Sequence, residues 1–237
     1  MKWAIISDIH ANEEALKAVL KDVKEREVDQ TFCLGDLVGY GPRPRECIEL
    51  ILKNNIPCVT GNHDNAATTF ELTYRTLEFN RNAKETNKWT HDQLKDKHKT
   101  YLENLPYVML KEKILLVHAS PKQPAGKHSY WEYIEIPDLK DEKKMDENLE
   151  GVHAEVVLTG HTHEAYRETV NGILLINPGS VGQPRGKKGP DSSYCLFNPE
   201  TKESEIVRVP YDYGKTQKQM AKIGMPEFDI KRLEIGK

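Results

Sequence analysis

The sequence predicts an α/β fold, and two patterns along the chain predict it. Near the start, short apolar runs alternate with longer stretches in which apolar residues recur at helical spacing. In the second half, short apolar runs follow one another closely, with turn residues between them. The first pattern is typical of a parallel sheet whose faces are covered by helices, and the second is typical of antiparallel strands.

The alternating pattern occupies residues 3–61. We expect strands at 3–7, 31–35 and 56–61, and helices between them at 12–26 and 43–55. In the first of these helices Leu16, Leu20 and Val23 share one face, so the helix can cover a sheet with its apolar side. Strands joined in this way by helices run parallel to one another.

The middle of the chain is more polar. Residues 71–105 are rich in charge with few apolar positions, and residues 121–150 combine Pro, Gly and aromatic residues with a charged helical stretch. Between them, residues 107–120 have the pattern of two strands around a turn at Lys111–Lys113. We expect a single domain over residues 1–237, in which the segments 71–105 and 121–150 are helical or loop insertions over the edge of the functional site.

The second pattern predicts further strands at 154–160, 164–170, 173–177, 192–198 and 203–209. Their close spacing favours antiparallel neighbours. We therefore expect the first half of the chain to supply one mixed, largely parallel sheet and the second half a more antiparallel one. The tail from residue 210 carries one helical stretch.

The composition is that of a globular protein. Of the 237 residues 38% are hydrophobic and 30% are charged, with a net charge of −3. Proteins that bind extended DNA or RNA usually carry a basic surface, so no stable nucleic-acid binding is expected. No apolar run is long enough for a membrane span or a signal peptide, and the four cysteines lack C-x-x-C spacing. We expect a cytoplasmic protein with reduced, buried thiols and no membrane partner, and homo-oligomerisation stays open.

Polar side chains follow several of the expected strands, at the point where each strand ends. They are Asp8, His10, Asp36, Asn62, His118, His161 and His163, with His63 next to Asn62. Because ligands of open α/β folds bind outside the carboxyl ends of the strands, we expect these side chains to converge at one edge. Carboxylates, imidazoles and a carboxamide without thiolates suit Mn, Fe, Zn or similar divalent ions.

These ligands are too many for one ion of ordinary coordination, but they suffice for two ions that share a bridging carboxylate. Two ions about 3.5–4 Å apart are the usual clamp for hydrolytic phosphoryl transfer. Taken singly, the residues have plainer explanations. Asp8 and His10 fit a solvated turn, Asn62 fits a turn former, and His118 fits a core histidine. Their occurrence in an ordered series favours the metal site.

Five motifs carry a resemblance to a known family. They are "DIH" at 8–10, "GDLVG" at 35–39, "GNHD" at 61–64, "VHAS" at 117–120 and "GHTH" at 160–163. In this order, up to about residue 185, the chain resembles the calcineurin-like metallophosphoesterases. The stretches "GDLVGYGPRPRECI" and "INPGSVGQPR" are similar to its small, single-domain bacterial and archaeal branch, which is linked to phosphodiesterase and phosphatase activities. The resemblance implies a four-layer αββα sandwich of two mixed β-sheets flanked by helices.

The resemblance also implies a role for each residue. Asp8, His10 and His163 would hold one metal ion. Asn62, His118 and His161 would hold a second ion, and Asp36 would bridge the two. A hydroxide between the ions would attack phosphorus in line with the leaving oxygen, and His63 would donate a proton to that oxygen or stabilise its charge. Two divalent ions per chain are expected, with Mn first and Fe, Zn, Ni or Co as alternatives.

The spacing within "GHTH" suggests how two histidines serve two ions. Alternate residues of an extended chain lie on one face, about 6.5–7 Å apart at Cα. We expect His161 and His163 to project from such a strand end, one toward each ion.

One departure from the family bears on the substrate. In the family's Ser/Thr phosphoprotein phosphatases, an Asp that orients the catalytic histidine and an Arg that grips phosphate follow the bridging Asp. Gly39 and Tyr40 stand at those places here, which disfavours phosphoprotein phosphatase activity. Candidate contacts for a substrate phosphate are instead Arg185 and Arg43, and His128 is a candidate for lining the substrate cleft.

The favoured function is a dinuclear metal-dependent phosphoesterase that hydrolyses phosphodiester or phosphomonoester bonds of a small phosphoester or nucleotide. One alternative is a hydrolase of dinucleoside polyphosphates. A DNA nuclease is disfavoured by the acidic balance of charge. A non-catalytic metal-binding scaffold for protein interaction is disfavoured because every expected ligand position, and His63, is filled.

Overall fold

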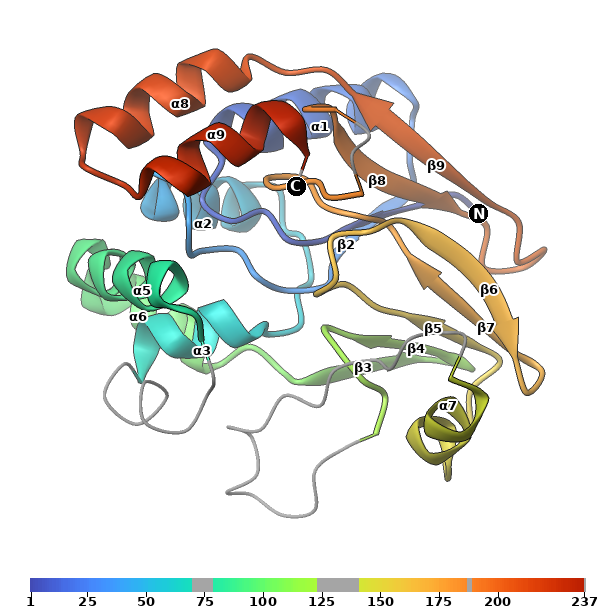
Figure 1. Cartoon of the computed structure of the whole chain (residues 1–237). Coiled ribbons are helices and arrows are strands. Elements are labelled where there is room, and N and C mark those ends of the chain that lie inside the picture. Colours follow the sequence, from blue (N-terminus) through green and yellow to red (C-terminus); the bar gives the residue numbers. More distant parts are fainter. Residues whose placement is uncertain (70–78, 123–140, 187–188, 237) are drawn as a thin grey trace.

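Two mixed β-sheets lie at the centre of the molecule, with helices outside them (Figure 1). The computed structural model describes residues 1–69, 79–122, 141–186 and 189–236. Sheet A consists of β1 (Trp3–Ile6), β2 (Gln30–Cys33), β8 (Ser192–Phe197) and β9 (Ser204–Val209), in the order β2-β1-β8-β9. Sheet B consists of β3 (Val108–Lys111), β4 (Ile114–Val117), β5 (Val156–Leu158), β6 (Tyr166–Val170) and β7 (Ile173–Asn177), in the order β3-β4-β5-β7-β6.

Strand pairing is partly parallel and partly antiparallel in both sheets. In sheet A, β1 is parallel to β2, with Ile5 opposite Phe32, and antiparallel to β8, with Ile5 opposite Cys195. Strand β9 pairs antiparallel with β8. In sheet B, β4, β5 and β7 are parallel, and β3 and β6 pair antiparallel at the two edges.

The sheets do not divide the chain into halves, so that expectation is wrong. Strands β8 and β9 complete sheet A, whereas β3 and β4 belong to sheet B. The expected antiparallel pairing of β5 is also wrong, since both of its neighbours are parallel to it. The connection from Val117 to Val156 is long enough to return the chain to the start of a parallel strand. Strand β6 then takes the edge and leaves β7 to pair with β5.

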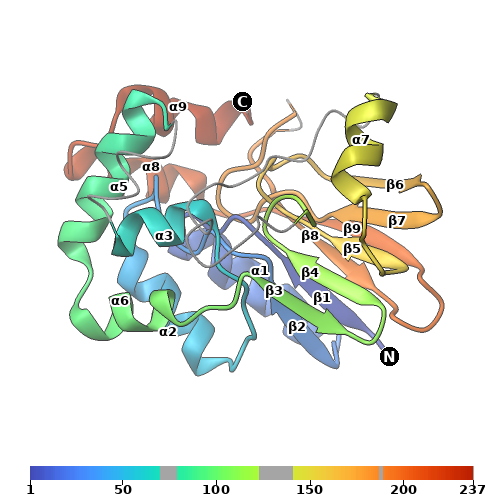
Figure 2. The ribbon, with the colours of Figure 1, turned by 90° about the horizontal axis from the view of Figure 1, so that it is seen from below.

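Eight helices are described. They are α1 (Glu13–Glu25), α2 (Pro44–Lys53), α3 (Asn62–Thr68), α5 (Arg81–Gln93), α6 (Asp96–Glu103), α7 (Glu142–Leu149), α8 (Tyr213–Lys222) and α9 (Glu227–Ile235). Among them, α3, α5 and α6 gather at one end of the strands, as Figures 1 and 2 both show.

The main core lies between the sheets. Ile5 and Phe32 of sheet A pack there with Leu116, Leu158 and Ile176 of sheet B, all with no exposed surface. Burying a side chain of this size contributes about 1.5–3 kcal/mol, so this layer is a main source of stability.

The outer faces of the sheets bury apolar side chains under helices. Leu16 of α1 and Ile48 of α2 pack with Ile6 on the outside of sheet A. Met145 of α7 packs with Val157 on the outside of sheet B. Figure 1 shows the resulting order, with α1 on one side of the sheets and α7 on the other. The expected four-layer αββα sandwich is therefore confirmed.

Two expected elements differ. The strand expected at 56–61 is reduced to an isolated bridge between Cys33 and Cys58, because Pro57 has no N–H to extend a ladder. The tail contains two helices, α8 and α9, instead of one. Gly224, with φ +73°, and Pro226, which precedes α9, separate them.

Several other expectations meet the structure only in part. The segments 71–105 and 121–150 contribute α5, α6 and α7, while residues 71–78 and 123–140 lie outside the described residues.

All four cysteines are buried and free, as expected. In the described part of the chain, the helices are too short or too polar to cross a membrane. The single domain, the cytoplasmic location and the partners stay predictions.

Candidate metal centre

The seven candidate ligands lie together where strands of both sheets end. Asp8 and His10 follow β1, Asp36 follows β2, His118 follows β4, His161 and His163 follow β5, and Asn62 begins α3. Six of them are at most 7% exposed, and His161 is half-buried. The predicted convergence at one edge of the strands is thus confirmed as geometry.

Asp8, His10 and His163 form a first group. His10 Nδ1 lies 3.1 Å from Val38 O, and His163 Nδ1 lies 2.7 Å from Gln183 O. A carbonyl only accepts, so both Nδ1 atoms are the protonated donors and both Nε2 atoms carry lone pairs. These Nε2 atoms face each other at 3.0 Å, and His163 Nε2 lies 3.3 Å from Asp8 Oδ1. Three electron-pair donors therefore converge, which is the arrangement that a cation requires.

His118, His161 and Asn62 form a second group with Asp36. His118 Nδ1 donates to Leu34 O at 2.7 Å, which leaves the lone pair on Nε2. That Nε2 lies 3.1 Å from Asn62 Oδ1, 3.3 Å from Asp36 Oδ2 and 3.3 Å from His161 Nδ1. This second convergence of nitrogen and oxygen atoms suits the same kind of ion.

Asp36 lies between the two groups. Its Oδ2 is 3.7 Å from His10 Nε2 and 3.3 Å from His118 Nε2, while Oδ1 accepts from the His63 N–H at 2.9 Å. One carboxylate oxygen thus faces both groups, in the position that a bridging ligand would take. Ligand atoms of His10, Asp36 and His63 also lie close enough together to hold an ion. The assignment of each residue to one ion therefore stays a prediction.

The backbone that carries these residues is strained. Asp8, His10, Asp36, His161 and His163 have φ between 48° and 68°, in the left-handed region. Non-glycine residues pay about 1–2 kcal/mol each for this conformation, and such residues cluster at functional sites. The expectation that His161 and His163 project from an extended strand is therefore wrong. They lie in a turn, yet they still fall in different groups.

Burial shifts the pKa values of the ionisable side chains in the site. Burial raises the pKa of Asp8 to about 6 and also raises that of Asp36. It lowers the pKa of His10 and of His163 well below 6.5. A bound divalent cation would compensate the charge of the buried carboxylates and would accept the lone pairs of the neutral imidazoles. It would also give a partner to Asp8 Oδ1, which has no hydrogen-bond partner among the described residues.

His63 lies beside the groups in less polar surroundings. Its ring centroid is 4.5 Å from that of Tyr40 and 5.0 Å from those of His10 and Phe79. Burial lowers the pKa of His63 to about 3, although its hydrogen bond to Asn87 opposes that shift. The imidazole is accordingly neutral near pH 7 in the absence of other charges.

Asn87 of α5 orients His63, and no motif in the sequence pointed to it. His63 Nδ1 donates to Asn87 Oδ1 at 2.8 Å, and Asn87 is 2% exposed. Gly39 makes room for this pair. A Cβ at position 39 would lie 2.5 Å from His63 Nδ1 and 3.0 Å from Asn87 Oδ1. A side chain at position 39 would therefore clash with the hydrogen-bonded pair of His63 and Asn87.

Asp64 is a second residue that the sequence reasoning did not use, although "GNHD" contains it. Its carboxylate accepts from the N–H groups of Leu37 at 2.8 Å, Val38 at 3.2 Å and Gly61 at 3.0 Å. These bonds join the loop after β2 to the start of α3, and so they hold Asp36 and Asn62 in place.

The three candidate substrate contacts have different outcomes. Arg185 lies at the site, where its backbone N–H donates to His163 O at 3.3 Å and its charge helps to lower the pKa of His163. Arg43 pairs with Gln219 and Glu46 at 3.3 and 3.5 Å. His128 lies outside the described residues.

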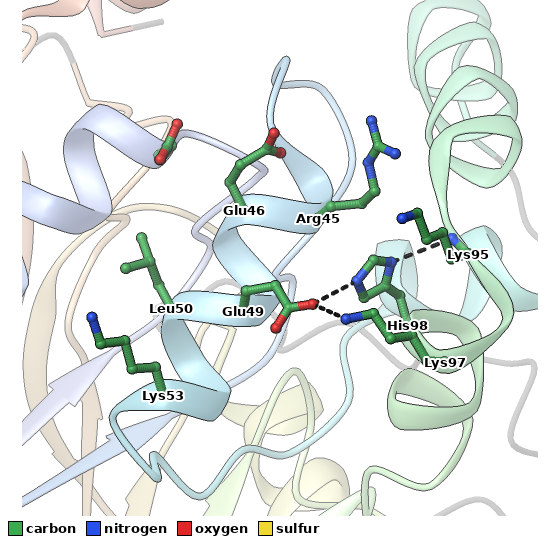
Figure 3. Close-up of a pocket in the computed structure, with 9 residues that line it drawn as sticks. Arg45, Glu46, Glu49, Leu50, Lys53, Lys95, Lys97 and His98 are labelled. Atoms are coloured by element: carbon green, nitrogen blue, oxygen red, sulfur yellow. Dashed lines mark hydrogen bonds and ion pairs between the residues drawn. The ribbon is translucent and has the colours of Figure 1, made fainter.

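A depression of about 440 Å³ between α2 and α6 is separate from this centre (Figure 3). It is lined by Glu13, Arg45, Glu46, Glu49, Leu50, Lys53, Lys95, Lys97 and His98. Glu49 forms an ion pair with Lys97 and accepts from His98 Nε2 at 3.0 Å. Acids and bases therefore pair with one another there, and the strand-end cluster is the candidate functional site.

Known proteins share both the sequence and the fold. Residues 1–202 match the model of the calcineurin-like phosphoesterase superfamily domain. An uncharacterized protein of Methanocaldococcus jannaschii is 37% identical over 254 residues, which cover 99% of this chain and 98% of the relative.

Two crystal structures resemble the chain over its whole length. A metallophosphoesterase from Sphaerobacter thermophilus is 37% identical with a TM-score of 0.79, over 100% of this chain and 99% of that one. A hypothetical protein from Pyrococcus horikoshii OT3 has the same TM-score at 24% identity, over 100% and 98% of the two chains, which speaks for the fold alone.

Proposed function

The chain belongs to the calcineurin-like phosphoesterase superfamily, and we propose that it is a phosphoesterase that uses two divalent metal ions. The substrate would be a small phosphodiester or phosphomonoester, including a nucleotide. The observation that carries this proposal is the pair of converging donor groups that share Asp36, with Asp36 Oδ2 3.7 Å from His10 Nε2 and 3.3 Å from His118 Nε2.

In this proposal Asp8, His10 and His163 hold one ion, and Asn62, His118 and His161 hold the other. Asp36 contributes to both. When bound, the ions would lower the pKa of a water molecule and neutralise charge on the phosphate. Manganese is the metal that we propose first, with Fe, Zn, Ni or Co as alternatives, because the donor set consists of imidazole nitrogens and oxygens.

His63 would assist the departure of the leaving oxygen. Its Nδ1 is committed to Asn87, so its Nε2 is the atom that would hold the transferable proton. The low pKa of the buried imidazole means that it is neutral at pH 7. We propose that the negative charge of an arriving phosphate raises this pKa and favours the protonated, donating form.

Two other functions are distinguishable from this one. A hydrolase of dinucleoside polyphosphates would use the same residues but prefer a phosphoanhydride. A non-catalytic scaffold would bind metal without turnover, and the retention of His63 and Asn87 as a hydrogen-bonded pair argues against it.

The test is hydrolysis of p-nitrophenyl phosphate, bis(p-nitrophenyl) phosphate and a diadenosine polyphosphate after chelation and addition of Mn, Ni, Co or Zn. We expect turnover of one of the p-nitrophenyl esters only with added metal. Asp36→Asn should lower it more than about 100-fold, because the substitution removes the charge shared by both groups. Asp92→Asn, at an exposed residue paired with Lys88, is the matched control.

The outcomes separate the alternatives. Preference for the diadenosine substrate would favour the polyphosphate hydrolase. Metal binding with no turnover of any substrate would favour the scaffold. Equal activity of Asp36→Asn and Asp92→Asn would contradict the shared role of Asp36.

A further inference from the structure

The loop after β7 lies where the two sheets meet at the metal centre. Residues 178–183, part of the stretch "INPGSVGQPR", lead from β7 of sheet B toward β8 of sheet A. The first group of candidate ligands also draws on both sheets, because Asp8 follows β1 of sheet A and His163 follows β5 of sheet B. A loop bonded to both residues can therefore fix how they face each other.

Ser180 of this loop is bonded to Asp8. Ser180 has no exposed surface, and its hydroxyl donates to Asp8 O at 2.8 Å. The Gly182 N–H donates to the same oxygen at 2.9 Å, while the Asp8 N–H donates to Gly35 O at 3.1 Å. Asp8 has a φ of 53°, a conformation that is unfavourable for a residue with a side chain. Two donors from the loop thus stabilise the strained backbone of a candidate ligand.

The same hydroxyl is connected to His163 through Gln183. The Gln183 N–H donates to Ser180 Oγ at 2.8 Å, and the Gln183 carbonyl accepts from His163 Nδ1 at 2.7 Å. The second bond leaves the lone pair of the imidazole on Nε2, which lies 3.3 Å from Asp8 Oδ1. Ser180 therefore supports Asp8 as a donor and, as an acceptor, supports the residue that orients His163.

The beginning of the loop supports the turn that carries His163. Asn177 has no exposed surface, and its Nδ2 donates to Gly160 O at 2.7 Å and to Thr162 Oγ1 at 3.1 Å. His163 itself has a φ of 63°. The loop thus holds His163 through the backbone of its turn as well as through its ring.

The loop is packed tightly against the turn that carries Asp8. A Cβ at position 182 would collide with Ile9 O, so the two backbones are in direct contact. Asn12 Nδ2 donates to Gly182 O at 2.9 Å, and Asn12 Oδ1 accepts from Thr216 Oγ1 of α8 at 3.0 Å. The backbone that carries Ser180 therefore has a defined position relative to Asp8.

We propose that Ser180 is a positioning residue for the ion of the first group, and that its hydroxyl fixes the placement of Asp8 relative to His163. This inference rests on the proposed function and adds to its site a residue that does not bind the ion itself. Removing a hydrogen-bond partner of a metal ligand typically lowers metal affinity about 10- to 100-fold. Among the described residues, the Ser180 hydroxyl bonds to Asp8 and Gln183 and to no member of the second group. The loss should therefore fall on one ion of the two.

The test compares Ser180→Ala with Ser192→Ala. Ser192 is equally buried, and its hydroxyl donates at 2.6 Å to Val181 O of the same loop, which is not a carbonyl of the first group. The first readout is calorimetric titration of the metal-free protein with Mn. Ser180→Ala should weaken one of two sites about tenfold or more and leave the other within about twofold, whereas Ser192→Ala should leave both within about twofold. Ser180→Cys, which keeps a weaker donor, should fall between.

Anomalous diffraction identifies the weakened ion. Crystals of Ser180→Ala at a Mn concentration between its two dissociation constants should show lower occupancy against Asp8 and His163. Lower occupancy against His118 and His161 would contradict the proposal.

A third readout needs no metal. The hydrogen bond to Gln183 O should protect the His163 Nδ1 proton from exchange with water, which NMR measures. Ser180→Ala should speed this exchange about tenfold or more, and Ser192→Ala should not.

The outcomes separate this inference from the function on which it rests. Equal Mn affinities of Ser180→Ala and Ser192→Ala at both sites would overturn the role of Ser180. Absence of metal binding by the unaltered protein, with faster proton exchange in Ser180→Ala alone, would overturn the proposed function and leave the positioning of His163 by Ser180 standing. Should Ser180→Ala fail to fold, Ser180→Cys decides the question by the same readouts.

Discussion

At the scale of single residues, the orientation of His63 is the feature on which the proposed chemistry depends most. Its Nδ1–H donates to a neutral amide oxygen, Asn87 Oδ1, in a buried place. An amide fixes the tautomer without adding a negative charge, and burial keeps the pKa of His63 low. Asn87 is thus a positioning residue, because it acts through His63.

Asn87→Leu should therefore impair proton donation more than binding. We expect kcat to fall about 10- to 100-fold for an alkyl phosphate such as glycerol phosphate, with KM nearly unchanged. With p-nitrophenyl phosphate the fall should be much smaller, because p-nitrophenolate leaves without a proton. Asn87→Asp, which keeps an acceptor oxygen, should restore most of the activity.

A double-variant comparison checks this assignment. In a His63→Ala background, Asn87→Leu should have little further effect, since both substitutions remove the same function. Additive losses on both substrates would contradict the positioning role.

Gly39 permits a second test at this scale. In Gly39→Ala the new Cβ would lie 2.5 Å from His63 Nδ1, at a φ of +86°. Gly151→Ala is a matched control, since its φ is +76° and nothing lies within 4 Å of the Cβ position. Both should lose about 1 kcal/mol to backbone strain, but only Gly39→Ala should lose further stability and displace His63. Thermal unfolding compares the two, and an equal fall in Tm would show that the contact has no cost.

The sequence predicted which polar side chains gather at the strand ends, but not the residues that support them. Asp8, His10 and His118 stand in short motifs directly after apolar strands, so local pattern identifies them. Asn87 reaches His63 from a polar helix 24 residues further along the chain, and only tertiary packing brings them together.

At the scale of elements, α9 links the far end of the chain to the site. Leu233 is 4% exposed and packs against the end of α8 and against Trp89 of α5. Leu233→Ala should cost about 2–5 kcal/mol through lost burial and a cavity. Ile235→Ala on the same helix, at a residue that is 45% exposed, should cost much less. Denaturant unfolding measures both, and equal losses would show that α9 is not docked through Leu233.

The elements also show where local pattern was not sufficient. Alternating strands and helices in residues 3–55 were predicted close to their observed bounds, because apolar periodicity and burial agree there. Which strands pair with one another was not predicted, because β8 pairs with β1 although nearly the whole chain lies between them. The "GHTH" segment was expected to be extended, but His161 and His163 have left-handed φ values that residue type does not reveal.

At the scale of the whole molecule, two sheets supply one site, and its metal affinity should depend on pH. Burial raises the pKa of Asp8 to about 6 and also raises that of Asp36, so both carboxylates hold protons at acidic pH that a metal must displace. The imidazoles of His10 and His163 have lowered pKa values and do not compete near pH 6. Affinity should therefore be nearly constant above about pH 8. Below about pH 6 it should fall about tenfold per pH unit for each carboxylate.

Manganese titration by calorimetry at about pH 5.5 and pH 8, in two buffers of different ionisation enthalpy, measures this linkage. More protons should be released per chain at the lower pH. The same number at both pH values would contradict the shifted carboxylates.

The four-layer architecture followed from the family resemblance more than from periodicity. Apolar alternation indicates that a strand is buried, but not which of two stacked sheets it enters. The assignment of β3 and β4 to sheet B, and of β8 and β9 to sheet A, is decided by long-range packing in the core around Ile5 and Leu116.

The central claim is that two ions share Asp36. Anomalous diffraction from crystals of the protein reconstituted with Mn tests it most directly. We predict two peaks about 3.5–4 Å apart. One should lie against Asp8, His10 and His163, the other against Asn62, His118 and His161, and both within bonding distance of Asp36. A single peak, or two peaks of which only one contacts Asp36, would contradict the claim.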